Sequence, residues 1–172
     1  MDSRTLVSRP ESQHLEFKSS TWHAYRNSEI PPEIMMKKLE AEVIEGIAGL
    51  LNSEGGCMFI GVADDNEILG LSKDLEARSL RDLDEYENTL IQRISSKIGK
   101  SVIASCVRTS FEELDGSHIF RINVKPSTTP VFYKEKGKSE IFFIRISNGT
   151  QRLTSPEIID YYSRHWLKLG SN

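Results

Sequence analysis

Residues 47–65, IAGLLNSEGGCMFIGVADD, contain the end of a helix, a strand and a turn in one short stretch. The run CMFIGV at 57–62 is continuously apolar and has a turn signal on each side, which is typical of a strand buried at the centre of a sheet. NSEGG before the run ends the helix, and ADDNE after it predicts a turn. The stretch therefore predicts a core helix that packs against a central strand.

Upstream of this stretch, the sequence predicts one strand and one long helix. Apolar residues recur at helical spacing over about 33–52, so we expect this helix to lie in the core. Its apolar positions are Met35, Leu39, Val43, Ile44, Ile47, Leu50 and Leu51. HLEFKSS at 14–20 alternates, which predicts a strand with Leu15 and Phe17 on one face and Glu16 and Lys18 on the other.

Downstream, the sequence predicts a second helix over about 78–98 and then several strands. VIASCVRTSFE and HIFRINVKP flank LDGS, whose Asp-Gly pair predicts a hairpin. SEIFFIRIS is expected as a third strand, PVFYK as a short edge strand, and ILGL as a short returning strand. TSPEIIDYYSRHW closes the chain as a helix with Ser155 as its N-cap. This order predicts an α+β (α/β) fold with a mixed, largely antiparallel sheet flanked by helices.

The composition is that of a globular protein with one domain over residues 1–172. The chain is 38% hydrophobic and 27% charged, and no stretch approaches the ~20 apolar residues of a membrane span. The N-terminus MDSRTLVSRPES lacks the apolar core of a signal peptide. Cys57 and Cys106 have neither metal-ligand nor disulfide spacing. We therefore expect a cytoplasmic protein with reduced cysteines.

The charge is divided unevenly along the chain. Residues 1–120 carry a net charge of −8 and residues 121–172 a net charge of +5, within a total of −3. This division favours metal-binding carboxylates beside a phosphate-binding surface, although a solvated surface also produces such asymmetry.

Three carboxylates could form a site with a divalent metal. Glu11 and Glu16 lie five residues apart, and residues at this spacing in one continuous strand point to opposite faces of the sheet. The two glutamates could therefore share a ligand only if a bend at Pro10–Ser12 precedes the strand. Asp64 follows the predicted central strand. Carboxylates without His or Cys suit Mg²⁺ or Mn²⁺, and Lys18 could stabilise the charge of a phosphoryl transition state. Clustered like charges also predict that alanine at any of the three would leave the melting temperature unchanged or raised. The alternative is that these carboxylates are solvated.

Basic residues in the last third of the chain could bind phosphates. They are Lys125, Lys134, Lys136, Lys138, Arg145 and Arg152. Phe132, Tyr133, Phe142 and Phe143 are interleaved with them and could stack bases, or could belong to the core instead.

Four segments in order along nearly the whole chain resemble the Schlafen AlbA-type domain in its short, single-domain form. They are ESQHLEFKSS at 11–20, IAGLLNSEGGCMFIGVADDNEILGL at 47–71, PSTTPVFYK at 126–134 and IFFIRISNGTQRLTSPEIIDYY at 141–162. The resemblance implies an α/β domain, two copies of which can form a positively lined clamp around RNA. A chain with one lobe is then expected to pair with itself as a homodimer, with Tyr161, Tyr162, Trp166 and Leu169 of the last helix as the candidate surface.

In ribonuclease members of the family, two glutamates and one aspartate form a metal-dependent RNA-cleaving site. Carried over by motif, Glu11 and Glu16 match the glutamates and Asp64 best matches the aspartate, with Asp65 as the register alternative. The resemblance thus predicts a metal-dependent endoribonuclease acting on structured RNA such as tRNA, with Lys134, Lys136, Lys138, Arg145 and Arg152 on phosphates. The alternatives are a non-catalytic DNA- or RNA-binding module, or a nucleotide (ATP) site at NSEGG and Gly61-Val62, where glycine amides could meet phosphate.

Overall fold

The computed structural model describes residues 1–26 and 29–167. In chain order, its elements are α1 (Ser3–Val7), β1 (Leu15–Lys18), α2 (Pro32–Leu51), β2 (Gly56–Ile60), α3 (Ser72–Arg78), α4 (Leu83–Ile98), α5 (Lys100–Cys106), β3 (Val107–Leu114), β4 (Ser117–Val124), β5 (Phe142–Ile146), β6 (Gly149–Leu153) and α6 (Ser155–His165). No helix in the described part of the chain is long and apolar enough to cross a membrane.

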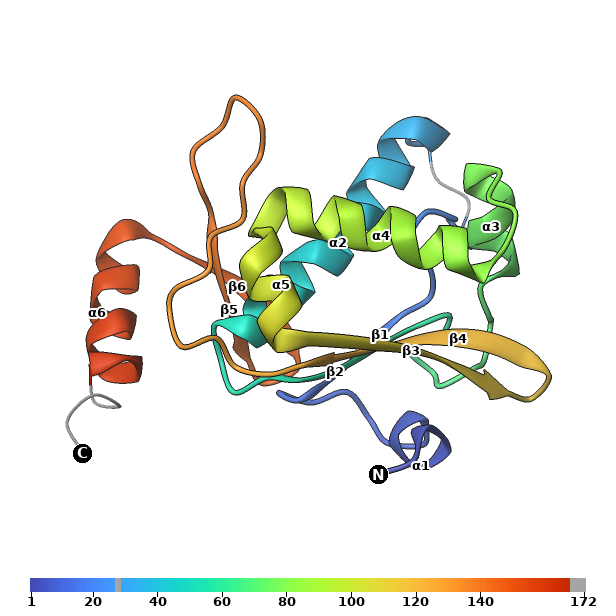
Figure 1. Cartoon of the computed structure of the whole chain (residues 1–172), viewed down its shortest axis with the longest axis horizontal. Helices are drawn as coiled ribbons and strands as arrows, with labels where there is room; N and C mark the ends of the chain where they lie inside the picture. Colours follow the sequence, from blue (N-terminus) through green and yellow to red (C-terminus); the bar gives the residue numbers. More distant parts are fainter. Residues whose placement is uncertain (27–28, 168–172) are drawn as a thin grey trace.

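Four strands form a mixed sheet in the order β1-β2-β4-β3, and β5 pairs with β6 in a separate two-stranded sheet (Figure 1). β1 runs parallel to β2, and the other pairs are antiparallel. The apolar run at 57–62 therefore supplies an inner strand, as predicted. β1 is an edge strand of the sheet, so the next layer can reach the polar groups along its open side.

The two faces of this sheet bury separate apolar clusters. On one face, α1 covers a small cluster that includes Val7, Leu15, Phe17 and Phe59. On the other face, α2, α4 and α5 cover the larger core, which contains Met58 (Figure 1). The predicted alternation of β1 is confirmed, because Leu15 and Phe17 face the first cluster. Glu16 and Lys18 consequently lie on the face that α2, α4 and α5 cover, at the edge of the larger core.

Two glycines allow the close approaches that bring these parts together. Gly56 has φ +152°, and a Cβ there would lie 2.4 Å from the His14 carbonyl oxygen, so a side chain would disrupt the start of β1–β2 pairing. A Cβ on Gly49 of α2 would already lie 3.2 Å from Thr150 Cγ2. The β5–β6 hairpin can therefore pack directly against the α2 backbone.

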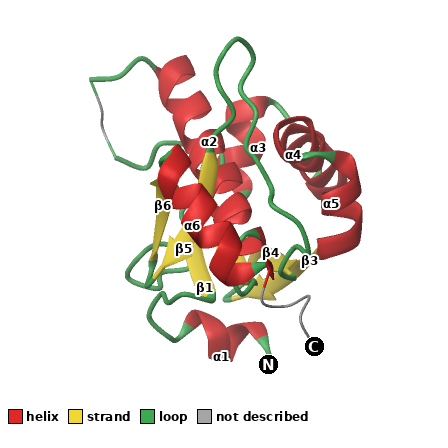
Figure 2. Ribbon diagram, turned by 90° about the vertical axis from the view of Figure 1, so that its left-hand side faces the viewer, coloured by secondary structure: helices red, strands yellow, loops and turns green. Residues whose placement is uncertain are grey.

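The β5–β6 hairpin lies beside β1 and α2, on the opposite side of the molecule from α4 and α5 (Figure 2). Asn52, buried at the end of α2, holds this arrangement. Its amide donates to the Val131 and Phe143 carbonyls at 2.8 and 2.9 Å and accepts from the Val131 N–H at 2.8 Å. On the outer side, α6 packs Trp166 against Phe142. The hairpin is thus fixed between α2 and α6.

The helices between β2 and β4 differ from the prediction. The expected helix over 78–98 begins at Leu83, where the Asp82 side chain accepts the Glu85 N–H at 2.9 Å, and a separate helix ends at Ser79 in the left-handed conformation. Residues 102–106, expected as strand, belong to α5. β-branched residues favour a strand locally, but Val102 and Ile103 bury their side chains in the main core from a helix.

Three strand assignments and one helix cap also differ from the prediction. β6 was not predicted, because TQRL has no apolar run. ILGL and PVFYK form single bridges, Val62–Ile68 and Tyr133–Ile141, instead of strands. The N-cap of the last helix is Thr154 rather than Ser155, and it forms a capping box with Glu157.

Candidate functional site

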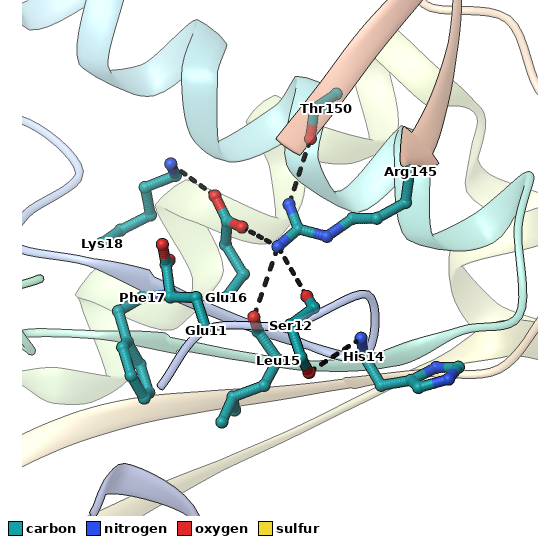
Figure 3. Close-up of polar contacts among 9 residues, drawn as sticks. All are labelled: Glu11, Ser12, His14, Leu15, Glu16, Phe17, Lys18, Arg145 and Thr150. Carbon is teal, nitrogen blue, oxygen red and sulfur yellow. Dashed lines mark hydrogen bonds and ion pairs between the residues drawn. The ribbon is translucent and has the colours of Figure 1, made fainter. Parts of the chain in front are cut away.

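Glu11 lies in the bend before β1 and turns back over the strand. Ser12 bridges Leu15, which closes a tight turn, and Glu11 Oε1 accepts the Phe17 N–H at 2.7 Å. This contact places the Glu11 carboxylate on the same side as Glu16 (Figure 3). A turn is therefore present, at Ser12–Leu15 instead of the expected Pro10–Ser12, and it meets the condition under which two glutamates five apart can share a site.

Glu16 is buried between two cations. Its Oε1 lies 2.6 Å from Lys18 Nζ, and its Oε2 forms an ion pair with Arg145 Nη2 (Figure 3). The Glu16 side chain is 7% exposed, and the Arg145 side chain is not exposed. Each charge offsets part of the desolvation cost of the other, so removal of either one would leave an unpaired charge in the interior.

Arg145 is a structural residue that joins β5 to the edge of the sheet. Its Nη2 donates to the Ser12 and Leu15 carbonyls at 3.0 and 3.3 Å, and its Nη1 donates to Thr150 Oγ1 at 3.4 Å. These bonds occupy the open edge of β1. The expectation that Arg145 contacts nucleic-acid phosphates is therefore corrected, because a buried guanidinium cannot reach a ligand on the surface.

The three predicted carboxylates line one open hollow of about 380 Å³, which we call the carboxylate pocket. Its lining residues are Glu11, Glu16, Phe17, Lys18, Glu42, Glu45, Asp64, Asn148, Gly149 and Thr150. Asp64 is exposed and belongs to this lining, whereas Asp65 does not and instead accepts the Glu67 N–H at 3.2 Å in the turn. Between the two register alternatives, the structure brings Asp64 to Glu11 and Glu16.

Glu42 and Glu45 of α2 belong to the carboxylate pocket but were not predicted. With Lys38 they lie at i, i+4 and i+7, which is one face of a helix. That spacing was visible in the sequence, but such a face is usually solvated. Burial raises the pKa of Glu45, and the charge of Glu42 raises it further.

The charges in the pocket affect one another. Burial raises the pKa of Glu11, the charges of Glu16 and Asp64 add to this effect, and the Phe17 N–H and Lys18 oppose it. Like charges held together in this way favour a bound cation, which would relieve their repulsion.

The donor chemistry of the pocket fits a hard divalent cation in part. Glu11, Glu42, Glu45 and Asp64 supply carboxylate oxygens, the ligands that Mg²⁺ and Mn²⁺ prefer. Both Glu16 oxygens are already engaged by Lys18 and Arg145. Within residues 1–26 and 29–167, no three His, Cys, Asp or Glu side chains are grouped closely enough to hold one ion. Of the predicted ligands, this leaves Glu11 and Asp64 as the carboxylates that could hold a metal, with Glu16 as their neighbour.

The basic residues predicted to bind phosphates are mostly exposed, whereas most of the aromatic residues interleaved with them in the sequence are buried. Lys134, Lys136 and Lys138 are exposed between Tyr133 and Ile141, and Arg152 is exposed on β6. Lys134 and Lys138 pair with Glu140 and Glu135 at 3.4 and 2.9 Å. Tyr133, Phe142 and Phe143 are buried, and Phe132 packs against Phe142. Tyr133, Phe142 and Phe143 are therefore core rather than base-stacking surfaces, whereas Phe132 is only partly buried.

The glycine amides considered for nucleotide binding have partners within the chain. The Gly55 N–H donates to the Leu50 carbonyl at 3.0 Å, and the Gly61 and Val62 N–H groups donate to the Lys18 carbonyl at 2.8 and 3.2 Å. These N–H groups shape the turns around β2 and are not free to bind a phosphate, so this feature does not favour the ATP alternative.

These features define an α+β domain with a carboxylate pocket at the edge of a mixed sheet. The family model described as Schlafen, AlbA_2 matches residues 11–154, and the chain therefore belongs to this family. The match includes Glu11, Glu16, Lys18 and Asp64. No curated protein matches the chain significantly.

Solved structures with a similar fold include the DIP2311 protein from Corynebacterium diphtheriae, with a TM-score of 0.56 and 17% identity over 88% of this chain. The match covers 27% of the DIP2311 chain, so this chain spans about a quarter of that protein. A second structure is the N-terminal domain of a protein from Nitrosomonas europaea that is described as related to the ATP-dependent DNA helicase RecG. Its TM-score is 0.46 and its identity 16%, over 90% of this chain and 95% of that one. At these identities, the DIP2311 match shows the fold alone.

Proposed function

We propose that this protein binds nucleic acid and cleaves RNA, such as tRNA, at the carboxylate pocket with the help of Mg²⁺ or Mn²⁺. The observation that carries the proposal is the convergence of Glu11, Glu16, Lys18 and Asp64, from segments far apart in sequence, on one open pocket. The family match over these same residues supports it.

Each residue has a distinct part in this proposal. Glu11 and Asp64 hold the divalent ion, which would polarise a phosphodiester and activate a water molecule. Glu16 orients Lys18 by its 2.6 Å ion pair, so that the lysine ammonium can meet the charge that develops on the phosphate. Glu16 thus acts as a positioning residue, which revises its expected role as a ligand. Lys134, Lys136, Lys138 and Arg152 contact more distant phosphates.

A second candidate is a module that binds nucleic acid without cleaving it. It is favoured by one specific observation, namely that both oxygens of Glu16 are engaged by cations. In that case Lys18 would bind phosphate in the ground state, and no divalent ion would be needed.

Labelled tRNA and single-stranded DNA, each with Mg²⁺, Mn²⁺ or EDTA, separate the two candidates. Asp64→Asn should abolish cleavage, because Asp64 is exposed and lines the pocket. Asp65→Asn is the matched control and should cleave as wild type, because an asparagine can still accept the Glu67 N–H. Glu11→Gln keeps an acceptor for Phe17 and should lose cleavage without a lower melting temperature. Binding without metal-dependent cleavage would establish the second candidate.

We further propose that the protein works as a cytoplasmic homodimer. Both cysteines are free thiols, which suits a reducing compartment. α6 exposes Ile159 and Tyr162, which lie three residues apart on one side of the helix. A dimer would place two basic surfaces around one RNA.

A further inference from the structure

A second hollow continues the carboxylate pocket past β1. It has a volume of about 460 Å³, and we call it the side groove. It shares four lining residues with the carboxylate pocket, namely Phe17, Lys18, Glu42 and Asp64. Its remaining wall is formed by residues 19–20 and 23–26, after β1, and by Met35, Lys38 and Leu39 of α2. A ligand at the carboxylate pocket can therefore extend into the side groove.

The charge changes along this path. The carboxylate pocket is lined by five carboxylates and Lys18, whereas the side groove adds Arg26, Lys38 and His23 to its wall. Among the described residues, neither Arg26 nor Lys38 has a carboxylate within ion-pair distance. A polyanion that places one phosphate at the carboxylate pocket would thus meet cations at its next phosphate.

An aromatic pair lies in the same wall. The rings of His23 and Tyr25 are 4.7 Å apart at 85°, and Tyr25 is 41% exposed. An edge-to-face pair of this kind holds the exposed ring in place, and an exposed aromatic ring next to cations can stack on a nucleic-acid base. Burial raises the pKa of the Tyr25 phenol, and the charges of three nearby carboxylates raise it further, so the ring stays neutral.

The wall is held in place by a buried carboxylate. Asp74 of α3 accepts the N–H groups of Thr21, Trp22 and His23 at 2.9, 2.7 and 3.1 Å, and the Ser20 hydroxyl also donates to it. Trp22 is buried and donates from Nε1 to Glu40 of α2 at 2.7 Å. The base of the segment that carries Tyr25 is therefore fixed before any ligand arrives, which lowers the entropy cost of binding.

We propose that the side groove binds one nucleotide of single-stranded RNA next to the phosphate at the carboxylate pocket, with its own phosphate on Lys38 and Arg26 and its base stacked on Tyr25. The inference rests on the proposed function and specifies its substrate, because stacking on a side chain requires an unpaired base. Cleavage would then occur beside an unpaired nucleotide in a loop or at an end.

Binding of a fluorescent 12-nucleotide oligouridylate in EDTA tests the side groove separately from cleavage. Lys38→Gln should weaken binding and make the dependence of affinity on salt shallower by about 0.7 in slope, the value for one phosphate contact on a single strand. Lys37→Gln is the matched control, because Lys37 is exposed on the same helix but does not line the groove. It should bind as wild type.

Tyr25→Ala should weaken binding roughly tenfold with an unchanged salt slope, because a lost stacking contact involves no counterion. Tyr25→Trp should retain or increase affinity, which excludes misfolding as the cause if both variants melt as wild type. A duplex of the same length should be insensitive to either change at Tyr25.

The outcomes separate the two proposals. If wild type binds oligouridylate and the Lys38 and Tyr25 variants match the Lys37 control, the side groove assignment is wrong and the proposed function stands. If wild type binds neither RNA nor DNA, the proposed function fails, and the side groove assignment fails with it. Equal loss of oligodeoxythymidylate binding in the variants would show that the groove accepts DNA, and the restriction to RNA would then be rejected.

Discussion

At the scale of single residues, the Glu16–Arg145 pair determines how substitutions at the candidate site must be interpreted. Clustering of carboxylates predicted that removing any one of them would leave the melting temperature unchanged or raised. The buried pair reverses this expectation for Glu16, because removing its carboxylate leaves the Arg145 guanidinium buried without its counter-charge. For Glu11 and Asp64 the expectation remains a prediction.

We expect Glu16→Ala to lower the free energy of unfolding by about 3–5 kcal/mol, the usual cost of breaking a buried ion pair from one side. Urea denaturation of Glu16→Ala, Arg145→Met and the double variant Glu16→Ala/Arg145→Met measures this. The double variant should lose less than the two single losses added together, because it leaves no unpaired buried charge. Strict additivity would show that the two residues do not stabilise each other.

At the scale of secondary-structure elements, contacts distant in sequence place the walls of the site. Asn52 and Gly49 bring the β5–β6 hairpin onto α2, and Arg145 attaches that hairpin to the edge of β1. On the other side, Asp74 of α3 holds the segment after β1. Each wall therefore depends on polar contacts between elements as well as on the apolar core.

Asp74 should make stability depend on pH. Burial raises the pKa of Asp74 in the folded protein above the ordinary value of 3.8, which applies to the unfolded chain. At a pH between the unfolded-state and folded-state pKa values, the folded protein therefore holds the proton more tightly than the unfolded chain. The contribution of Asp74 to stability is then fully present below pH 3.8 and falls as the pH rises through the folded-state pKa. Asp74→Asn should be less stable by about 1–3 kcal/mol, because the amide cannot accept from all of the N–H groups.

Thermal unfolding of wild type and Asp74→Asn from pH 3.5 to 7 measures this effect. The difference in stability between the two proteins should be larger at pH 3.5 than at pH 7. A difference that grows with pH would mean that the hydrogen bonds outweigh burial and lower the pKa.

The exposed lysines between Tyr133 and Ile141 should contribute to nucleic-acid affinity through charge alone. The triple variant Lys134→Gln/Lys136→Gln/Lys138→Gln should weaken binding similarly for RNAs of different sequence and make the salt dependence shallower by about 0.7–0.9 per lost contact. Fluorescence titrations at several salt concentrations measure the slope. Lys73→Gln, an exposed change on α3, is the control, and an unchanged slope in the triple variant would show that these lysines are solvated surface.

At the scale of the whole molecule, α6 divides between the core and the surface. Trp166 is buried and donates from Nε1 to the Ser127 carbonyl at 3.1 Å, and the Tyr161 hydroxyl donates to the Asn52 carbonyl at 2.8 Å. These two residues therefore pack within their own chain and are not available to the expected dimer surface. Tyr162 is 39% exposed, and Leu169 lies outside the described residues.

The proposed homodimer should appear in light scattering at micromolar concentration as about twice the chain mass of 19.5 kDa. Ile159→Asp and Tyr162→Asp should dissociate it, because the exposed side of α6 would then carry charge. A mass near 19.5 kDa with full RNA binding would refute the dimer. If the dimer persists in both variants, α6 is not its interface. Trp166→Ala is unsuitable for this test, because it should destabilise the monomer by about 3–5 kcal/mol.

Local patterns in the sequence predicted the central strand, the long core helix and the alternation of β1, and they showed that Glu11 and Glu16 would need a turn between them to share a site. They also led to Asp64. The same patterns misassigned residues 102–106, where the β-branched pair Val102 and Ile103 packs from a helix. Intrinsic preferences for helix or strand amount to fractions of a kcal/mol per residue, so burial in a core can outweigh them.

The sequence by itself thus determined the class of fold, the family and the segments that carry the candidate carboxylates, because these depend on residue spacing within single elements. Only the tertiary structure decided that Arg145 is buried on Glu16 instead of exposed, that Glu42 and Glu45 line the pocket, and that Asp64 rather than Asp65 does so. Each of these outcomes depends on which elements meet across the fold. The sequence around a charged residue on a strand or helix is the same whether its side chain faces water or contacts a residue of opposite charge that lies far away in the chain.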